Sequence, residues 1–359
     1  MTFGLLDQRT YDVGVDSRAV IDFGSEGMHR RLVLGGSLSR QHGDELRYAN
    51  IEGRPGANNG HAQLVARQAS LYGEYSHGIT QALTLQAGVQ ATRAGRELTN
   101  HANNSGSYSE GFGGISPKLG FLYQLTATGQ LYGNISRSFE APPFGELVVR
   151  PAFPLASAQR ATTAEMGYRY RKADAWVDAS AYHSLIRGEL LSLNDGNGVA
   201  LGTVNADRTV HQGVELASQL PISQTVRVRT NYLFNHYRFK NDPVYGSNTI
   251  AGLPPHLLRA ELRWQVAASL YVAPSIEWRG GKTFIDHANT LEQRGYTLLN
   301  LMIGGNLTPT LRWYVEGRNL SNRRYVASTA VQANVRARDG SYYFPGDRRS
   351  VYAGLEWRM

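Results

Sequence analysis

The chain has 359 residues, carries a net charge of +8 at neutral pH and contains no cysteine. The lack of cysteine excludes disulfides, thiolate catalysis and cysteine-ligated zinc sites. Lysine and arginine are scattered along the whole length, with no block longer than two residues, so we expect no binding to nucleic acid.

The composition favours strands and turns over helices. Charged residues make up 18% of the chain, while glycine (39 residues) and tyrosine (20 residues) are frequent, a mixture that suits strands and the turns between them. No apolar run approaches about 18 residues, which excludes a transmembrane helix. A membrane strand is not excluded, because a polar residue at every second position dilutes its apolar residues.

Apolar and polar residues alternate with a period of two along the chain, as in strands with one apolar face. In residues 256–267, Leu258 and Trp264 fall on one side, and Arg259 and Glu261 fall on the other. We expect about fifteen strands. The clearest of them, in chain order, lie near residues 10–23, 162–171, 256–267, 310–320 and 351–359.

The connections between these strands alternate between short and long. The short ones span residues 126–129, 172–174, 221–224, 267–269 and 308–310. The long ones cover about 41–63, 94–114, 139–161, 188–209, 239–256, 280–295 and 321–350. Strict alternation is typical of a transmembrane β-barrel with short periplasmic turns and long extracellular loops. We therefore predict an all-β fold, an antiparallel transmembrane β-barrel in the bacterial outer membrane.

The last strand fits a barrel wall. Val351, Leu355 and Trp357 are predicted to face lipid, and Glu356 and Arg358 to face a wet lumen. A closed sheet has no edge to protect, so a strand can end the chain.

An odd number of strands places the N-terminus on the extracellular side, because bacterial barrels have even strand numbers and periplasmic termini. The N-terminal residues also lack the features of a secretory signal. We therefore expect residues 1–359 to be the C-terminal portion, about 15–16 strands, of a longer barrel protein.

Four stretches contain motifs that indicate a protein family as well as a fold. They are residues 131–147 (LYGNISRSFEAPPFGEL), the pair 209–218 (TVHQGVELAS) and 313–328 (WYVEGRNLSNRRYVAS), and residues 344–359 (FPGDRRSVYAGLEWRM). In this order they closely resemble the C-terminal barrel region of TonB-dependent outer-membrane receptors. The resemblance covers essentially the whole chain.

This resemblance implies a barrel of about 22 strands filled by an N-terminal plug. It implies uptake of a scarce ligand, most often a ferric siderophore, driven by the TonB–ExbB–ExbD system, and contact with outer-membrane lipid and lipopolysaccharide. The chain departs from the family pattern because it has no plug and no TonB-contacting segment. It also ends on Met359, where such barrels usually end on an aromatic residue.

Basic and aromatic residues of the long connections are candidates for ligand contact, because arginine suits carboxylate or catecholate oxygens and tyrosine suits flat organic groups. These candidates are Arg150, Phe153, Arg160, Tyr245, His256, Arg324, Tyr325 and Arg336. For the arginines, solvation or contact with lipopolysaccharide phosphates is the simpler role, and a lone histidine is more often structural. A salt-bridged ladder on the lumen wall is predicted for Arg259, Glu261, Arg263, Arg312 and Glu316.

No HExxH, G-x-S-x-G or P-loop motif occurs, so we expect neither an enzyme nor a cofactor or metal site. A passive porin of about sixteen strands is the main alternative and would conduct ions through an open lumen. An outer-membrane protease or lipase would need a carboxylate–histidine or serine–histidine cluster on the strand rims. A soluble lectin-like or propeller protein would have connections of similar length at both ends of its sheet.

Overall fold

The computed structural model describes residues 4–24, 29–102, 106–147, 154–194 and 200–358. These residues form strands, with one short 3₁₀ helix. The elements are β1 (Leu5–Asp22), β2 (Arg30–Ile51), β3 (Arg54–Gly78), β4 (Leu83–Asn100), β5 (Tyr108–Thr126), β6 (Gly129–Glu140), η1 (Phe144–Glu146), β7 (Gln159–Lys172), β8 (Ala175–Asn194), β9 (Ala200–Pro221), β10 (Val226–Phe239), β11 (His256–Ala267), β12 (Leu270–Phe284), β13 (Glu292–Asn306), β14 (Leu311–Arg318), β15 (Val326–Thr329), β16 (Tyr343–Pro345) and β17 (Ser350–Trp357).

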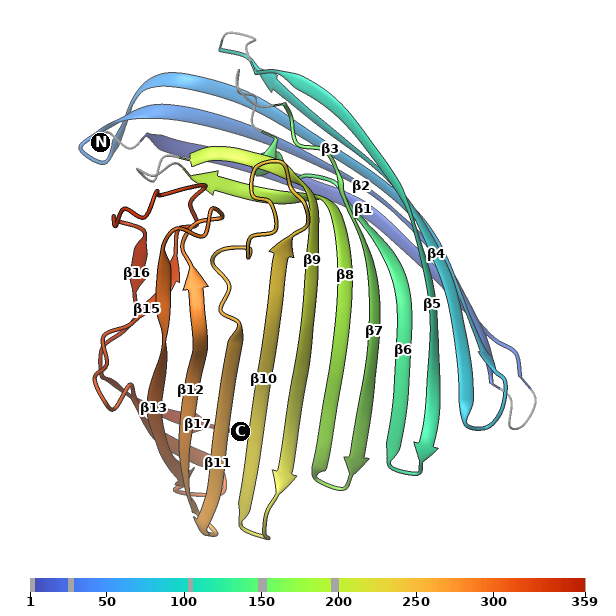
Figure 1. The fold of residues 1–359 in the computed structure, drawn as a ribbon, viewed down its shortest axis with the longest axis vertical. Coiled ribbons are helices and arrows are strands. Elements are labelled where there is room, and N and C mark those ends of the chain that lie inside the picture. The colour runs from blue at the N-terminus through green and yellow to red at the C-terminus, as the bar shows by residue number, and fades with distance from the viewer. Residues whose placement is uncertain (1–3, 25–28, 103–105, 148–153, 195–199, 359) are drawn as a thin grey trace.

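Within the described ranges, fifteen strands form one antiparallel sheet in the order β1 to β14 followed by β17, and β15 and β16 form a separate hairpin (Figure 1). The predicted all-β fold and strand number are therefore confirmed. No helix in the part of the chain that the structure describes is long and apolar enough to cross a membrane.

The two ends of the sheet differ. Tight turns, such as those between β5 and β6 and between β7 and β8, lie at the lower end in Figure 1, and the longer connections lie at the upper end. We call these the tight-turn end and the loop end. The N-terminal strand begins at the loop end, where Leu5 pairs with Tyr48, and the last strand finishes at the tight-turn end, where Trp357 pairs with Leu311.

Several of the predicted long connections are mostly strand, which corrects the expectation of loops there. Strands β2 and β3 continue to a two-residue turn at Glu52 and Gly53, where Ile51 pairs with Arg54. Both turn residues have positive φ (51° and 85°), the conformation of a type I′ hairpin turn. Strands β4, β5, β8, β9, β12 and β13 also extend into the expected loops, because hairpin pairing satisfies the backbone groups that a loop would leave to water.

One apolar face runs across the whole sheet, because residues paired across an antiparallel ladder point to the same side. At the C-terminal edge, the predicted lipid-facing residues Val351, Leu355 and Trp357 are 69%, 74% and 70% exposed. In β11, Leu262 and Trp264 are also exposed and do not pack into a core. The opposite face carries the charged residues of the same strands.

Aromatic residues mark both borders of the apolar face. Near the loop end, the ring of His256 stacks on Trp278 and its Nδ1 lies 2.8 Å from the Tyr232 hydroxyl. Near the tight-turn end, Trp264 and Trp357 are exposed on the same face. Eight residues separate His256 from Trp264, which corresponds to about 26 Å of strand. Tilted by about 40°, such a strand spans about 20 Å, close to the apolar band of an outer-membrane barrel.

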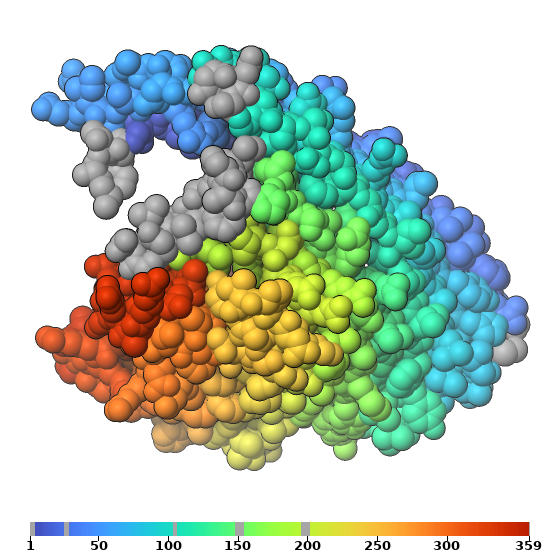
Figure 2. All heavy atoms as spheres, turned by 45° about the horizontal axis from the view of Figure 1, so that its top comes forward, coloured from blue at the N-terminus to red at the C-terminus, as the bar shows by residue number. Residues whose placement is uncertain are grey.

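The sheet curls into an open trough. Its edges are β1 and β17, and each has a single hydrogen-bonded neighbour among the described strands. Figure 2 shows the N-terminal strands (blue) and the C-terminal strands (red) on either side of the opening. The polar face lines the inside of the trough, and the apolar face forms its outside.

We expect cysteines placed at adjacent positions of β11 to report opposite environments, and the cysteine-free chain gives a clean background. A bimane label on L262C should be quenched by brominated lipid, because this side chain lies on the apolar face. The same label on E261C should be quenched by aqueous iodide. Equal lipid quenching at both positions would contradict the assignment of the faces.

Candidate ligand-binding site

A polar pocket of about 520 Å³ opens on the inner face of the trough, between the middle of the sheet and the loop end. Its wall comes from β10 to β14 and β17. Segments that flank the β15–β16 hairpin add Asn319, Tyr325, Asp347 and Arg348 to the rim. The pocket therefore combines a rigid wall of strands with side chains from the longest connection.

The charges of the pocket wall are partly neutralised. Arg259 pairs with Glu277 across β11 and β12, with 3.1 Å between Nη2 and Oε2. On β14, Arg318 lies 2.7 Å from the Glu316 carboxylate. These ion pairs hold two guanidinium groups against the wall.

Two further arginines of the pocket are held by neutral groups. The Nε of Arg229 donates a hydrogen bond to Gln219 Oε1 at 2.8 Å, and the Nε of Arg348 donates to Asn322 Oδ1 at 2.9 Å. An amide oxygen orients a guanidinium group without cancelling its charge. The terminal nitrogens of these two guanidinium groups are therefore suited to donate hydrogen bonds to oxygen atoms of an anionic ligand.

The rim is fixed by Asn319, which is buried. Its backbone N–H donates to Asn300 Oδ1 at 2.9 Å, and its side-chain amide donates to the backbone oxygens of Arg323 and Asp347. Beside it, the ring of Tyr325 packs against another tyrosine ring at 4.5 Å. Burial raises the pKa of Tyr325, so its hydroxyl stays a neutral hydrogen-bond donor.

Above the pocket, the connections of the loop end are locked together around Asp286, which is fully buried. Its carboxylate accepts hydrogen bonds from Thr290 Oγ1 at 2.6 Å and from the Val335 backbone at 3.0 Å. Gln332, also fully buried, forms parallel bridges with both Asp286 and Asn194. Residues 285–291 are thereby tied to residues 330–337 and to the end of β8.

His287 joins a third connection, residues 240–255, to residues 285–291 and 330–337. We call these three segments the loop cluster. Its Nδ1 accepts a hydrogen bond from the Ala251 backbone at 3.3 Å, and its ring contacts Phe239 edge-on at 5.3 Å and Tyr245 at 5.4 Å. Burial lowers the pKa of His287 to about 4, although the nearby carboxylates Glu189, Asp286 and Asp242 act in the opposite direction. The ring is therefore neutral at pH 7.

A family model described as TonB dependent receptor-like, beta-barrel matches residues 2–320. The chain belongs to this family of TonB-dependent receptor barrels. Its sheet therefore lies in the bacterial outer membrane, with the tight-turn end in the periplasm, the loop end outside the cell and the apolar face in lipid.

Several known outer-membrane proteins are similar to this chain. An iron-regulated outer membrane virulence protein of Vibrio cholerae serotype O1 is 22% identical over 205 residues, which cover 50% of this chain and 30% of that protein. The ferric citrate transporter FecA has a similar structure, with a TM-score of 0.82 and 16% identity over 98% of this chain and 55% of FecA. The ferric yersiniabactin uptake receptor FyuA of Yersinia pestis gives a TM-score of 0.75 and 16% identity over 99% of this chain and 55% of FyuA. This chain thus spans about half of these solved receptors.

The receptor barrel brings one of the predicted contact residues, Tyr325, into the luminal pocket. Arg324 and Arg336 are exposed on the connection between β14 and β17. The predicted contacts Arg150 and Phe153 lie outside the described residues.

The other predicted residues lie away from the pocket. Tyr245 packs inside the loop cluster. His256 stacks on Trp278 at the lipid face, which is a structural position. Arg160 donates a hydrogen bond to the backbone oxygen of Gly113 at 3.1 Å and so contacts strand β5.

The sequence reasoning did not select Arg229, Arg348 or Asp347 as pocket residues. Alternation places Arg229 on the polar face, but only the docking of the last connection brings Arg348 and Asp347 beside it. On the predicted lumen ladder, Arg259 pairs with Glu277 on the next strand and not with Glu261.

We expect the extracellular loop cluster to loosen as the pH falls. In the unfolded loops His287 takes up a proton below about pH 6.5, but the buried ring does so only near pH 4. The unfolded form therefore binds more protons between these values, and the free energy that orders the loops decreases as the pH drops through this window. Hydrogen exchange of the Ala251 amide should accelerate across it.

H287N is the matched variant, because an amide oxygen can accept the same hydrogen bond without titrating. Its exchange rates should depend less on pH, after correction for intrinsic exchange. An unchanged pH dependence in H287N would show that another group controls the loops.

Proposed function

We propose that this chain forms the ligand-receiving barrel of a TonB-energised receptor for an anionic iron chelate, most simply a ferric siderophore. The observation that supports this best is the luminal pocket, where Arg229 and Arg348 are oriented by amide oxygens and remain positively charged. Tyr325 adds a neutral hydroxyl and an aromatic surface at the rim. Carboxylate or catecholate oxygens of a chelate match these donors.

The named functions of similar structures support the same class of ligand. They include transport of ferric citrate, uptake of ferric yersiniabactin and import of ferric catecholates. A copper transporter, OprC, is also similar, with a TM-score of 0.76. We infer that the cargo here is a metal complex recognised through its organic chelator. The described residues contain no group of three or more histidine, aspartate or glutamate side chains that could hold a bare metal ion.

We also propose that these strands work as the C-terminal portion of a larger closed barrel that holds a plug. The two edges of the sheet, β1 and β17, have a single neighbour each in the described part of the chain. Lipid cannot satisfy the backbone groups of an open edge. Further strands between these edges, and a plug that TonB can pull, would provide the energised step.

We expect R229Q/R348Q to weaken binding of a ferric chelate by about 10-fold to 100-fold, because each lost charge-assisted hydrogen bond is worth about 1.5–3 kcal/mol and neighbouring contacts compensate in part. Quenching of intrinsic tryptophan fluorescence by a panel of ferric citrate, catecholate and hydroxamate complexes measures the affinity. The matched control is R171Q, a lumen-facing arginine near the periplasmic turns, outside the pocket.

Uptake separates this function from a passive channel. Iron uptake through the complete receptor should stop when the proton-motive force is collapsed. Continued uptake would favour a porin-like protein. Binding of the complexes with equal affinity by the R229Q/R348Q variant would reject the pocket as the site.

A further inference from the structure

A second polar pocket, of about 380 Å³, opens on the inner face of the trough near the tight-turn end. Strands β11 to β14 and β17 form its wall, and Ser269 lines it from the turn between β11 and β12. We call it the periplasmic pocket. It shares strands with the luminal pocket of Arg229 and Arg348, but the two pockets have no lining residue in common.

Two arginines of the periplasmic pocket lie at the inner border of the wall. Arg263 precedes Trp264, which marks this border on the apolar face of β11, so its side chain points to the lumen. Arg312 pairs with Glu356, whose neighbour Trp357 marks the same border on β17. Both arginines therefore face the lumen close to where it meets the periplasm.

Arg263 is held by an aromatic ring and not by a carboxylate. Its Cζ lies 3.6 Å from the centre of the Tyr271 ring. A guanidinium group that stacks on a ring keeps its charge, and its N–H groups remain available in its plane. The neighbouring Arg227 is different, because it lies 2.9 Å from the Asp174 carboxylate.

The positive charge of the periplasmic pocket exceeds its negative charge. Among the described residues that line it, Glu356 is the only carboxylate. Its Oε1 lies 2.8 Å from the Nε of Arg358, so Arg312 shares this carboxylate with a second guanidinium group. Neither Arg263 nor Arg312 forms an ion pair with any residue that the structure describes.

Tyr314 adds a flat surface to the periplasmic pocket. Its ring lies over Gly354, where a side chain would collide with it, and the residue is exposed on the luminal side of β14. One face of the ring is therefore open to a ligand. Two guanidinium groups and an open aromatic face suit a ligand that combines carboxylate or catecholate oxygens with a flat organic part.

The two pockets follow one another along the same strands. Arg259 of the luminal pocket and Arg263 are four positions apart on β11, which corresponds to about 13 Å along the strand. Glu261 lies between them and pairs with Arg229 across the ladder. A carboxylate between the two basic sites repels an anion, so the sites are separate binding positions and not one long groove.

We propose that Arg263 and Arg312 form a second binding site for the anionic ferric chelate, at the periplasmic end of the lumen, with Tyr314 against its organic part. This site receives the chelate after the luminal pocket releases it. The inference rests on the proposed function, because the same class of ligand occupies both sites.

Two fluorescent labels separate the sites in the full chain, extracted from outer membranes in mild detergent. Bimane on S269C reports on the periplasmic pocket and bimane on N231C reports on the luminal pocket, because each residue lines its pocket. Titration with ferric citrate or a ferric tris-catecholate complex should give saturable quenching of both labels. We expect R263Q/R312Q to raise the dissociation constant at S269C by about tenfold or more. The value at N231C should stay the same, which also shows that the variant folds.

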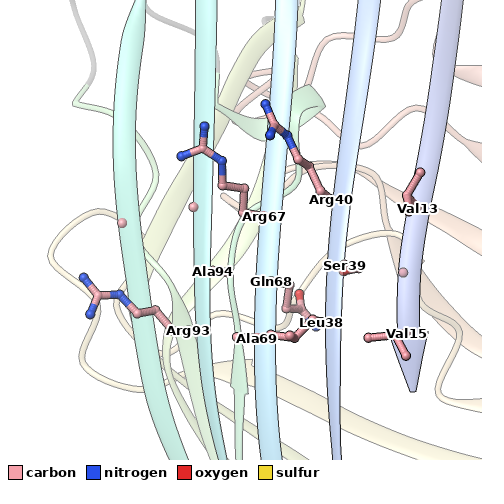
Figure 3. Close-up of a pocket in the computed structure, with 13 residues that line it drawn as sticks. Val13, Val15, Leu38, Ser39, Arg40, Arg67, Gln68, Ala69, Arg93 and Ala94 are labelled. Carbon is pink, nitrogen blue, oxygen red and sulfur yellow. The ribbon is translucent and has the colours of Figure 1, made fainter. Parts of the chain in front are cut away.

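Two control variants remove the same charge elsewhere. R18Q/R171Q removes it from the lumen side near the tight turns, outside the pocket. R40Q/R93Q removes it from the outer face of β2 and β4 (Figure 3). Neither control should change the titration at S269C. An equal loss of affinity in R18Q/R171Q would assign the effect to the overall charge of the lumen and overturn the site.

The remaining outcomes separate this inference from the proposed function. Saturable quenching at N231C without quenching at S269C would overturn the periplasmic site and leave the proposed function intact. Unchanged affinity at S269C in R263Q/R312Q would also overturn the site alone. Quenching of neither label in the unaltered chain would reject both.

Discussion

The structure depends on one constraint: in hydrocarbon, every backbone N–H and C=O must find its partner within the sheet. Each strand from β2 to β13 is paired on both sides with its sequence neighbours, and β14 is paired with β13 and β17. Because paired residues point to the same side, the pairing also fixes the side-chain direction from strand to strand. A shift of one residue would exchange the two faces. For this reason a single apolar face extends from Val15 on β1 to Trp357 on β17, and all charges of the wall are sorted to one side or beyond its borders.

The same sorting gives arginine distinct roles in this protein. Arg229 and Arg259 face the lumen, where carboxylates and amide oxygens orient them around a pocket. Arg40 and Arg93 lie on the outward face of β2 and β4, where they form no ion pair with a described residue. Two properties decide which environment an arginine meets. One is whether its position in the alternating strand points to the lumen or to the outside, and the other is how far along the strand it lies. Residue type alone therefore says little about function in such a wall.

The extracellular connections form a structured layer on this wall. Buried Asp286, Gln332 and His287 join three connections by hydrogen bonds and bridges to their backbones, beside two small hydrophobic clusters, one around Phe239 and Ile250 and one around Ile285 and Val335. Such networks are stable only when nearly all members are paired. The same connection also carries Arg348 to the rim of the pocket, where Asn322 holds it, and Asn319 bonds the backbone of Arg323 and Asp347.

The sequence by itself determined the strands, their faces and the membership of the receptor family, because period-two alternation and short turns are local properties that one ladder of hydrogen bonds translates directly into a wall. It also located the lipid-facing Leu262 and Trp357 and the luminal Arg259 correctly. It did not determine the length of the strands beyond the membrane, where hairpins such as Ile51–Arg54 replace the expected loops. It did not determine the pocket either, since Arg229 and Arg348 are 119 residues apart in the chain. Only the packing of the last connection against the wall brings them together, because contacts between distant segments depend on how the curled sheet and its loops fit in space.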